Sequence, residues 1–374
     1  MATIILTTTS QTFQIDTYPA ETLLEALRRN NLPVFGMLLL DENDQPISLA
    51  ASLDSGATVH AVSMRNADFR IISPKYAYET VPNPIGELFR PEEAANSLTL
   101  RQYSRETAMD QVYESVASVL DRHINSRPQS DVPIKLQIAL SPGGDGRILA
   151  EALSIYKRRH PNVSFFALIV AVGFEDETEH LTEGAILAER FGFTYRTIGV
   201  REGADLLGYR ESLDSLSSSF REDFPRDEPE MLLTYWVQEL NLLVAREMES
   251  DAVILGYNQE DVIADHLYSL LLNIRLERYP IRTVNSSIFL APLYKVPKRL
   301  LDAMDLENSK RNYRLRTPSR SYTRSSLYLL SYLIVEKFPA LADKFAGDAL
   351  DVDERQSLES WLQDNSAFRD STAL

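Results

Sequence analysis

The chain has 374 residues, of which 44% are hydrophobic and 25% charged, and its formal net charge is −16. This composition is typical of a globular protein with room for two domains, and the acidity argues against a general surface for nucleic-acid backbones. Cysteine is absent, which excludes disulfides, cysteine-ligated iron–sulfur clusters, thiolate zinc sites and a persulfide carried on this chain. With no apolar run near the roughly 20 residues of a membrane span and no secretory signal at the N-terminus, we expect a soluble, cytoplasmic protein.

Residues 1–72 show a compact pattern of short elements. Two β-rich runs (3–8 and 12–16) precede a helical spacing over 20–31, and two further strands are expected over 35–40 and 58–64. The order ββαββ resembles the ubiquitin-like β-grasp fold, a small α+β domain found in sulfur carriers and ferredoxins. This segment does not end in Gly-Gly, so it cannot carry a thiocarboxylate, and we expect a docking or structural role.

Residues 73–100 contain four prolines and little periodicity, which predicts a linker. A helix is expected over 102–124. From residue 134 onward, strands (134–140, 164–172, 193–200, 252–255) alternate with helices (147–159, 178–191, 228–249, 262–274). This alternation predicts a parallel sheet with helices on both faces, which binds ligands beyond the carboxyl ends of its strands.

The first of these strands ends in a glycine-rich turn, Ser141-Pro142-Gly143-Gly144-Asp145-Gly146, and helix-forming residues follow from Arg147. A strand, a glycine-rich turn and a helix place free backbone N–H groups and a helix dipole against a phosphate. The turn is not a Walker sequence, because no Lys-Ser or Lys-Thr follows. An ordinary βα turn is the alternative reading.

A second strand-to-helix turn, Gly256-Tyr257-Asn258-Gln259-Glu260-Asp261, follows the strand at 252–255. Farther on come the segment Ala291-Pro292-Leu293-Tyr294-Lys295-Val296-Pro297 and a helical pattern over 324–345. Between them, residues 310–324 hold six basic residues and no acidic one. That basic stretch is either a solvated loop or an anion-contacting patch.

Taken together, these segments resemble the PP-loop ATP pyrophosphatases, in particular the enzymes that thiolate tRNA bases. The first turn resembles the S-G-G-x-D-S loop, the second G-H-N-x-D-D, and residues 291–297 and 324–345 resemble a P-L-(R)-x-(I/V)-P segment and the closing helix. The resemblance covers roughly residues 100–345. It implies an α/β, Rossmann-like (HUP-type) PP-loop domain over 101–346, followed by an acidic C-terminal helix or tail over 347–374.

The resemblance also implies a site and a reaction. ATP would be split to AMP and pyrophosphate while a carbonyl or amide oxygen is adenylated, and sulfur or nitrogen would then replace that oxygen. Asp145 and Asp261 would be catalytic and hold Mg²⁺, although an N-cap and a first-turn helix acid are the simpler readings of these two. The nucleotide would contact Leu140, Ser141, Gly143, Gly144, Asp145, Gly146, Arg147, Ala171, Gly256 and Asn258. Lys295, Arg314, Arg316 and Arg320 would form a substrate or anion patch.

The chain also departs from that family. Pro142 removes one N–H from the loop, Gly146 replaces a phosphate-contacting serine, and the stretches at 227–231 and 317–321 lack the family's cysteines. Sulfur would therefore have to arrive free or on a sulfur-donor partner protein. Three functions stay open: an adenylating enzyme acting on a tRNA base or a small molecule, a catalytically inactive subunit of a homologous thiolating enzyme, and a nucleotide-binding sensor. The oligomeric state is open too, a homodimer included.

Overall fold

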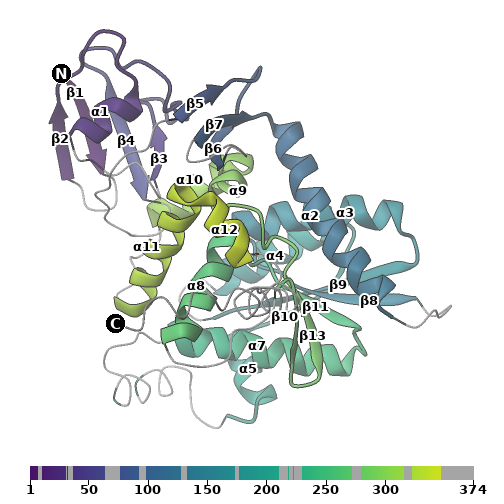
Figure 1. Cartoon of the computed structure of the whole chain (residues 1–374). Coiled ribbons are helices and arrows are strands. Elements are labelled where there is room, and N and C mark those ends of the chain that lie inside the picture. The colour runs from purple at the N-terminus through teal and green to yellow at the C-terminus, as the bar shows by residue number, and fades with distance from the viewer. Residues whose placement is uncertain are drawn as a thin grey trace, which may run out of the picture.

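The computed structural model describes residues 1–6, 11–30, 32, 37–63, 76–91, 98–127, 133–172, 177–209, 218, 222, 230–271, 279–315 and 322–346. These ranges hold three β-sheets, with helices packed around the largest of them (Figure 1). Within these ranges, every helix is too short or too polar to serve as a membrane span. The acidic segment over 347–374, for which the sequence predicts a helix or tail, lies outside the described residues.

The N-terminal unit is a four-stranded sheet with one helix. Its elements are β1 (Ala2–Leu6), β2 (Gln11–Ile15), α1 (Leu23–Arg29), β3 (Met37–Leu40) and β4 (Thr58–Ser63), and the strand order is β2-β1-β4-β3. The central pair β1 and β4 is parallel, whereas both outer pairs are antiparallel. A capping box of Thr22 and Glu25 starts α1, whose apolar side chains are buried against the sheet. The predicted order ββαββ is present, and the likeness to ubiquitin-like proteins stays a prediction.

The segment for which the sequence predicts a linker forms a second sheet instead. Its strands are β5 (Tyr76–Glu79), β6 (Gly86–Pro91) and β7 (Leu98–Tyr103), in the order β5-β7-β6. Pro82 and Pro84 lie between β5 and β6, and Pro91 ends the edge strand β6, so the prolines occupy positions that a sheet tolerates. The buried carboxylate of Glu87 ties this sheet to the N-terminal unit, because it accepts a hydrogen bond from the Leu49 N–H at 2.9 Å.

The main sheet has the order β10-β9-β8-β11-β13-β12. Its strands are β8 (Ile134–Ala139), β9 (Val163–Val170), β10 (Thr194–Ile198), β11 (Ala252–Ile254), β12 (Ile281–Val284) and β13 (Ser287–Leu290). All neighbouring strands are parallel except β12, which pairs antiparallel with β13. The predicted α/β class is therefore correct. The β12–β13 hairpin has no strong signal in the sequence, because Asn285 and Ser286, rather than glycines, supply its positive φ angles of 47° and 67°.

Helices cover both faces of this sheet. They are α2 (Arg105–Asn125), α3 (Gly144–Arg159), α4 (Glu177–Arg190), α5 (Val200–Leu206), α7 (Glu230–Glu247), α8 (Gln259–Leu271), α9 (Lys298–Met304), α10 (Leu306–Leu315), α11 (Tyr322–Lys337) and α12 (Pro339–Ala346). One buried cluster joins α2 and α3 to β8 and β9, for example through Val116, Leu153 and Phe165. A separate cluster joins α5 and α7 to β9 and β10 through Trp236 and Ile198. Burial of these two apolar layers holds the edge of the sheet, and the turns that leave it, in place.

The N-terminal unit packs against α10 and α11 (Figure 1). Leu38, Leu40 and Val62 form a buried cluster with Tyr332 of α11. The Lys310 ammonium of α10 also donates a hydrogen bond to the Asp44 carbonyl at 2.7 Å. The N-terminal unit is therefore joined to α10 and α11 by an apolar cluster and by a polar contact from Lys310.

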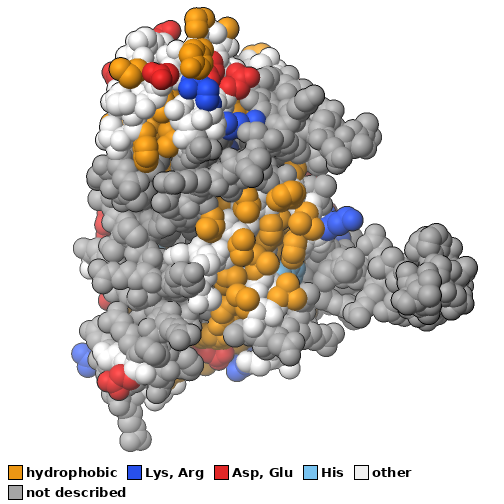
Figure 2. All heavy atoms as spheres, turned by 60° about the vertical axis from the view of Figure 1, so that its left-hand side comes forward, with side chains coloured by type: hydrophobic (Ala, Val, Ile, Leu, Met, Phe, Trp, Pro, Cys, Tyr) orange, Lys and Arg blue, Asp and Glu red, His pale blue; other side chains and the backbone are white. Residues whose placement is uncertain are grey.

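Hydrophobic side chains gather on one face below the N-terminal unit (Figure 2). Helices α8, α11 and α12 pack together, and the exposed large hydrophobic side chains on them are Leu270, Leu271, Leu330 and Leu341, with Phe338 exposed between α11 and α12. Leu271 is 67% exposed and Phe338 55% exposed, so this apolar surface is larger than single scattered residues would give.

Candidate functional site

The glycine-rich turn after β8 leads directly into α3. Gly143 is the N-cap of α3, with an extended backbone (φ −63°, ψ 167°), and no side chain caps the helix. Asp145 is thus inside the first turn, and its reading as an N-cap is wrong. No described residue accepts a hydrogen bond from the backbone N–H of Gly144, Asp145 or Gly146. Backbone N–H groups of this kind at the start of a helix are suitable donors for an anion, and the binding of a phosphate here stays a prediction.

Gly146 marks a difference from the family loop. A Cβ atom at this position would lie 2.0 Å from the Ser141 carbonyl oxygen and 3.1 Å from the Ser141 carbonyl carbon. The space for the family's serine side chain is therefore filled by the backbone of Ser141. Glycine is required here by close approach of two backbone segments, and a serine would not fit without a change of the turn.

The second predicted turn meets the first one through Asn258, which is 1% exposed. Its side-chain amide donates to Asp145 Oδ2 at 3.1 Å, and its Oδ1 accepts from the Asp261 N–H at 3.0 Å. Its own backbone N–H donates to Asp261 Oδ2 at 3.1 Å. Asn258 therefore caps α8 and also bridges to α3, so the two turns share one site.

This meeting point lies where the order of the sheet reverses. From β8 the chain proceeds to β9 and β10 on one side, whereas β11 lies on the other side of β8 and is followed by β13. Parallel α/β sheets bind ligands outside the carboxyl ends of their strands at such a reversal. Ala171, another predicted contact, directly follows β9 at the same edge, where its N–H donates to the Ile198 carbonyl at 2.9 Å.

The lysine at the site is Lys298, which the sequence pattern did not single out. It is the first residue of α9, directly after the segment 291–297. Its ammonium lies 2.6 Å from Asp145 Oδ1 and 2.8 Å from Asp302 Oδ1, and its side chain is 8% exposed. Lys295, the residue proposed from the sequence, is exposed, with its ammonium 5.2 Å from the centre of the Tyr294 ring. Lys298 directly follows Pro297, the last residue of the 291–297 segment, and this position in the sequence is the signal that would have identified it.

The predicted magnesium ligands do not fit a metal ion. Asp145 accepts hydrogen bonds from Lys298 and from Asn258, one on each oxygen. Asp261 accepts from the Tyr328 hydroxyl on Oδ1 at 2.9 Å and from the Asn258 N–H on Oδ2. Magnesium needs several oxygen ligands at about 2.0–2.1 Å in an octahedral arrangement. Every oxygen of these two carboxylates is instead held by a donor, and the described residues contain no cluster of three or more metal-ligating side chains.

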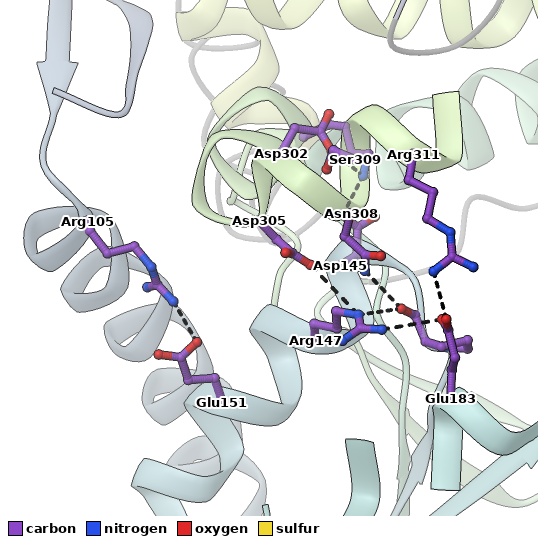
Figure 3. A network of polar contacts seen from close by, with 12 residues as sticks. Arg105, Asp145, Arg147, Glu151, Glu183, Asp302, Asp305, Asn308, Ser309 and Arg311 are labelled. Carbon is purple, nitrogen blue, oxygen red and sulfur yellow. Dashed lines mark hydrogen bonds and ion pairs between the residues drawn. The ribbon is translucent and has the colours of Figure 1, made fainter. Parts of the chain in front are cut away.

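The corner between α9 and α10 covers the turn (Figure 3). The Asn308 amide donates to the Pro142 carbonyl at 3.2 Å, and a Cβ on Gly144 would lie 3.2 Å from Ser309 Oγ. Asp305 lies beside them, and burial raises the pKa of its carboxyl group. Side chains from this corner thus lie where a phosphate group over Gly144 would be expected.

Arg147 is held next to this corner. Its Nε donates to the Pro142 carbonyl at 2.8 Å and lies 3.9 Å from Asp305 Oδ2. Its Nη2 lies 3.4 Å from Glu183, which also pairs with Arg311 at 2.8 Å (Figure 3). Arg147 therefore lies at the predicted loop, but its charge is balanced by acidic neighbours.

The basic stretch is only partly described. Lys310 is 5% exposed and pairs with Glu307 at 2.9 Å, and Arg311 pairs with Glu179 and Glu183. The side chain of Arg314, and Arg316 and Arg320 entirely, lie outside the described residues. The two described basic side chains at its start are engaged within the protein, so the anion patch stays a prediction for the others.

Two titratable groups lie near Asn258, the buried Glu260 and the partly buried Tyr257. Burial raises the pKa of the Glu260 carboxyl group to about 8, and Glu260 Oε2 accepts a hydrogen bond from the Lys298 backbone N–H at 2.8 Å. Burial also raises the pKa of Tyr257 to about 12. Gly256 has open surroundings, because a Cβ there would meet only Leu149, at 3.8 Å.

Comparison with known proteins gives structural neighbours only. No family model matches the sequence, and no curated protein matches it. The structure is similar to the U34-tRNA thiolase NcsA from Methanococcus maripaludis, described with its [4Fe-4S] cluster, at 17% identity and a TM-score of 0.49, covering 69% of this chain and 82% of that one. It is also similar to NAD⁺ synthetase from Burkholderia pseudomallei, at 15% identity and a TM-score of 0.36, covering 65% and 89%.

Proposed function

We propose that the chain is a PP-loop type protein whose turn at 141–146 binds the phosphate tail of ATP for an adenylation reaction. The observation that carries the proposal is the hydrogen bond of Asn258 to Asp145, because it joins the two predicted turns at the reversal of the sheet. The uncapped first turn of α3 supports it by supplying backbone donors for a phosphate.

In this reaction an oxygen of the acceptor attacks the α-phosphorus of ATP. The bond between the α-phosphorus and its bridging oxygen breaks, and pyrophosphate leaves with that oxygen. Positioning and neutralisation of charge on the phosphates are the main demands on the protein. Arg147 and Lys298 are the cations next to the turn, and both would have to exchange part of their carboxylate contacts for phosphate oxygens.

The adenylated carbon then accepts a sulfur or nitrogen nucleophile, and AMP leaves with the original oxygen. Because the chain has no cysteine, it cannot supply sulfur from its own thiol. Sulfide, an amine or a sulfur-donor partner protein would provide the nucleophile. A net charge of −16 favours a small-molecule acceptor, or a tRNA base presented by a partner.

Calorimetric titration with ATP tests the binding step. We expect heat of binding in the millimolar range or tighter, with a weaker response in Arg147→Ala, which removes a cation at the turn. No binding at millimolar ATP would refute the proposal. Release of pyrophosphate by the isolated chain, lost in Asp145→Asn, would establish the chemical step.

A second function is favoured by specific observations. The Ser141 carbonyl fills the space next to Gly146, and Asn308 and Ser309 cover the turn. Both features suit a catalytically inactive subunit that supports an active, cysteine-bearing partner, and the N-terminal unit would then be its docking module. Co-purification with such a partner and absence of pyrophosphate release would favour this function, whereas ATP binding without turnover would indicate a nucleotide sensor.

A further inference from the structure

The ammonium of Lys298 is fixed between two carboxylates. It lies 2.6 Å from Asp145 on α3 and 2.8 Å from Asp302 one turn later on α9. The three side chains are 8%, 17% and 1% exposed, in the order Lys298, Asp145 and Asp302. An exposed ion pair is weakened by the surrounding water, whereas this lysine and its two partners are largely shielded from solvent.

Neighbouring groups hold these three residues in place by further hydrogen bonds. Asp302 also accepts a hydrogen bond from Ser309 Oγ at 2.9 Å, and Asp145 accepts the Asn258 amide. The Lys298 backbone N–H is bound to Glu260, so the first residue of α9 is anchored at both its backbone and its side chain. Without the ammonium, two largely buried negative charges would face each other without the cation that now lies between them, which is a costly arrangement.

We propose that Lys298 takes the place of a divalent cation at this site, so that the chain does not bind magnesium through Asp145. A magnesium ion about 2.0–2.1 Å from Asp145 would lie next to the Lys298 ammonium, and the two positive charges would repel each other in this largely buried place. The phosphate part of this inference rests on the proposed function: a phosphate tail would meet a lysine rather than a protein-bound metal. The cation part rests only on the three side chains.

The inference predicts a hidden metal site. In Lys298→Met the side-chain length is kept, but the positive charge is lost, and Asp145 and Asp302 become available as oxygen ligands. Titration with Mn²⁺, followed by the electron paramagnetic resonance signal of the free ion, should show little binding to the wild type. The variant should bind Mn²⁺ at least roughly tenfold more tightly, because carboxylate oxygens are suitable ligands for it. Lys298→Met combined with Asp145→Asn should lose that gain.

A Mn²⁺ titration of the wild type, with Asp145→Asn for comparison, can overturn the inference without the Lys298 variant. Stoichiometric Mn²⁺ binding to the wild-type chain that disappears in Asp145→Asn would show that Lys298 does not exclude the metal. This measurement decides the matter even if Lys298→Met fails to fold. In a folded Lys298→Met variant, absence of any gain in Mn²⁺ affinity would also contradict the inference.

Titration with inorganic pyrophosphate separates this inference from the proposed function. We expect the wild type to bind it equally well, within about twofold, in EDTA and in excess Mg²⁺ once the metal complex of pyrophosphate itself is allowed for. Binding that requires Mg²⁺ would contradict the inference while leaving a phosphate site in place. Failure to bind under either condition would remove the proposed function, and the Mn²⁺ result would still decide the role of Lys298.

Discussion

Substitution of Gly146 by alanine tests the close backbone approach in the turn. Its Cβ would be placed 2.0 Å from the Ser141 carbonyl oxygen, whereas real Cβ atoms essentially never come closer than 3.0 Å. The turn must therefore open by about 1 Å, and strain of this kind in a packed site costs typically about 1–3 kcal/mol. Alanine also gains up to about 1 kcal/mol in helix propensity, so the net loss measures strain that exceeds this gain.

Gly143→Ala is the matched control in the same turn. A Cβ there would meet only Ser141 Oγ, at 3.6 Å, which is an ordinary contact. We expect it to lower the free energy of unfolding by less than about 1 kcal/mol, the usual cost of alanine at an N-cap. Gly146→Ala should cost more than this control, by up to about 2 kcal/mol, in urea unfolding monitored by circular dichroism.

Equal stability of the two variants would refute the reasoning. It would mean that the Ser141 carbonyl does not lie against Gly146 in solution, and that the turn has the room of the family loop. Gly146→Ser, which brings the family's serine to this position, should then also be tolerated. If the close approach is real, Gly146→Ser should be less stable than the wild type by at least about 1 kcal/mol.

Three further predictions concern buried groups. The pKa of Glu260 is raised from 4.5 to about 8, so between these pH values the folded state binds a proton that the unfolded state has lost. The free energy of unfolding should therefore fall as the pH rises from about 4.5 to about 8, by no more than about 1.4 kcal/mol per pH unit. Glu260→Gln should remove this slope, and parallel pH profiles of the two proteins would contradict it. Asn258→Ala should lower stability by about 2–3 kcal/mol because it strands its hydrogen-bond partners, and a loss below about 0.5 kcal/mol in urea unfolding would show that the bridge to Asp145 is not formed. Tyr332→Ala should lower the free energy of unfolding by about 3–5 kcal/mol, because Tyr332 is only 1% exposed and packs against the N-terminal unit. The control Leu330→Ala on the same helix, at a residue that is 44% exposed, should lower it by less than about 0.5 kcal/mol. Equal losses in the two variants would refute the packing between the N-terminal unit and α11.

The main sheet was predictable because its strands carry strong local signals. Ile134 to Ala139 and Val163 to Val170 are rich in apolar and β-favouring residues and are bounded by turns, as is typical of buried parallel strands. The strands at 76–79, 86–91 and 98–103 were missed since four prolines outweighed their weak alternation. Proline excludes a central strand, but it does not exclude a turn or the end of an edge strand.

The two turns of the site were predictable from sequence, and their contact was not. Glycines and acids at strand ends pointed to 141–146 and 256–261, because parallel strands end at one edge of the sheet. The partners of Asp145 come from residues 113 and 153 positions away, Asn258 and Lys298. Local patterns carry no information on such pairing, so a carboxylate matched to an ammonium looked in the sequence like a carboxylate ready for a metal.

One turn of α10 contacts both the glycine-rich loop and the N-terminal unit. Ser309 Oγ lies over Gly144, while the very next residue, Lys310, reaches the Asp44 carbonyl in the N-terminal unit. Lifting this turn to admit a nucleotide would drag Lys310 away from Asp44, so access to the loop and seating of the N-terminal unit are thermodynamically linked. A molecule that binds better to the lifted state would weaken the contact between Lys310 and Asp44 by the same factor. In return, a protein that binds the N-terminal unit would change the affinity of the loop for a nucleotide.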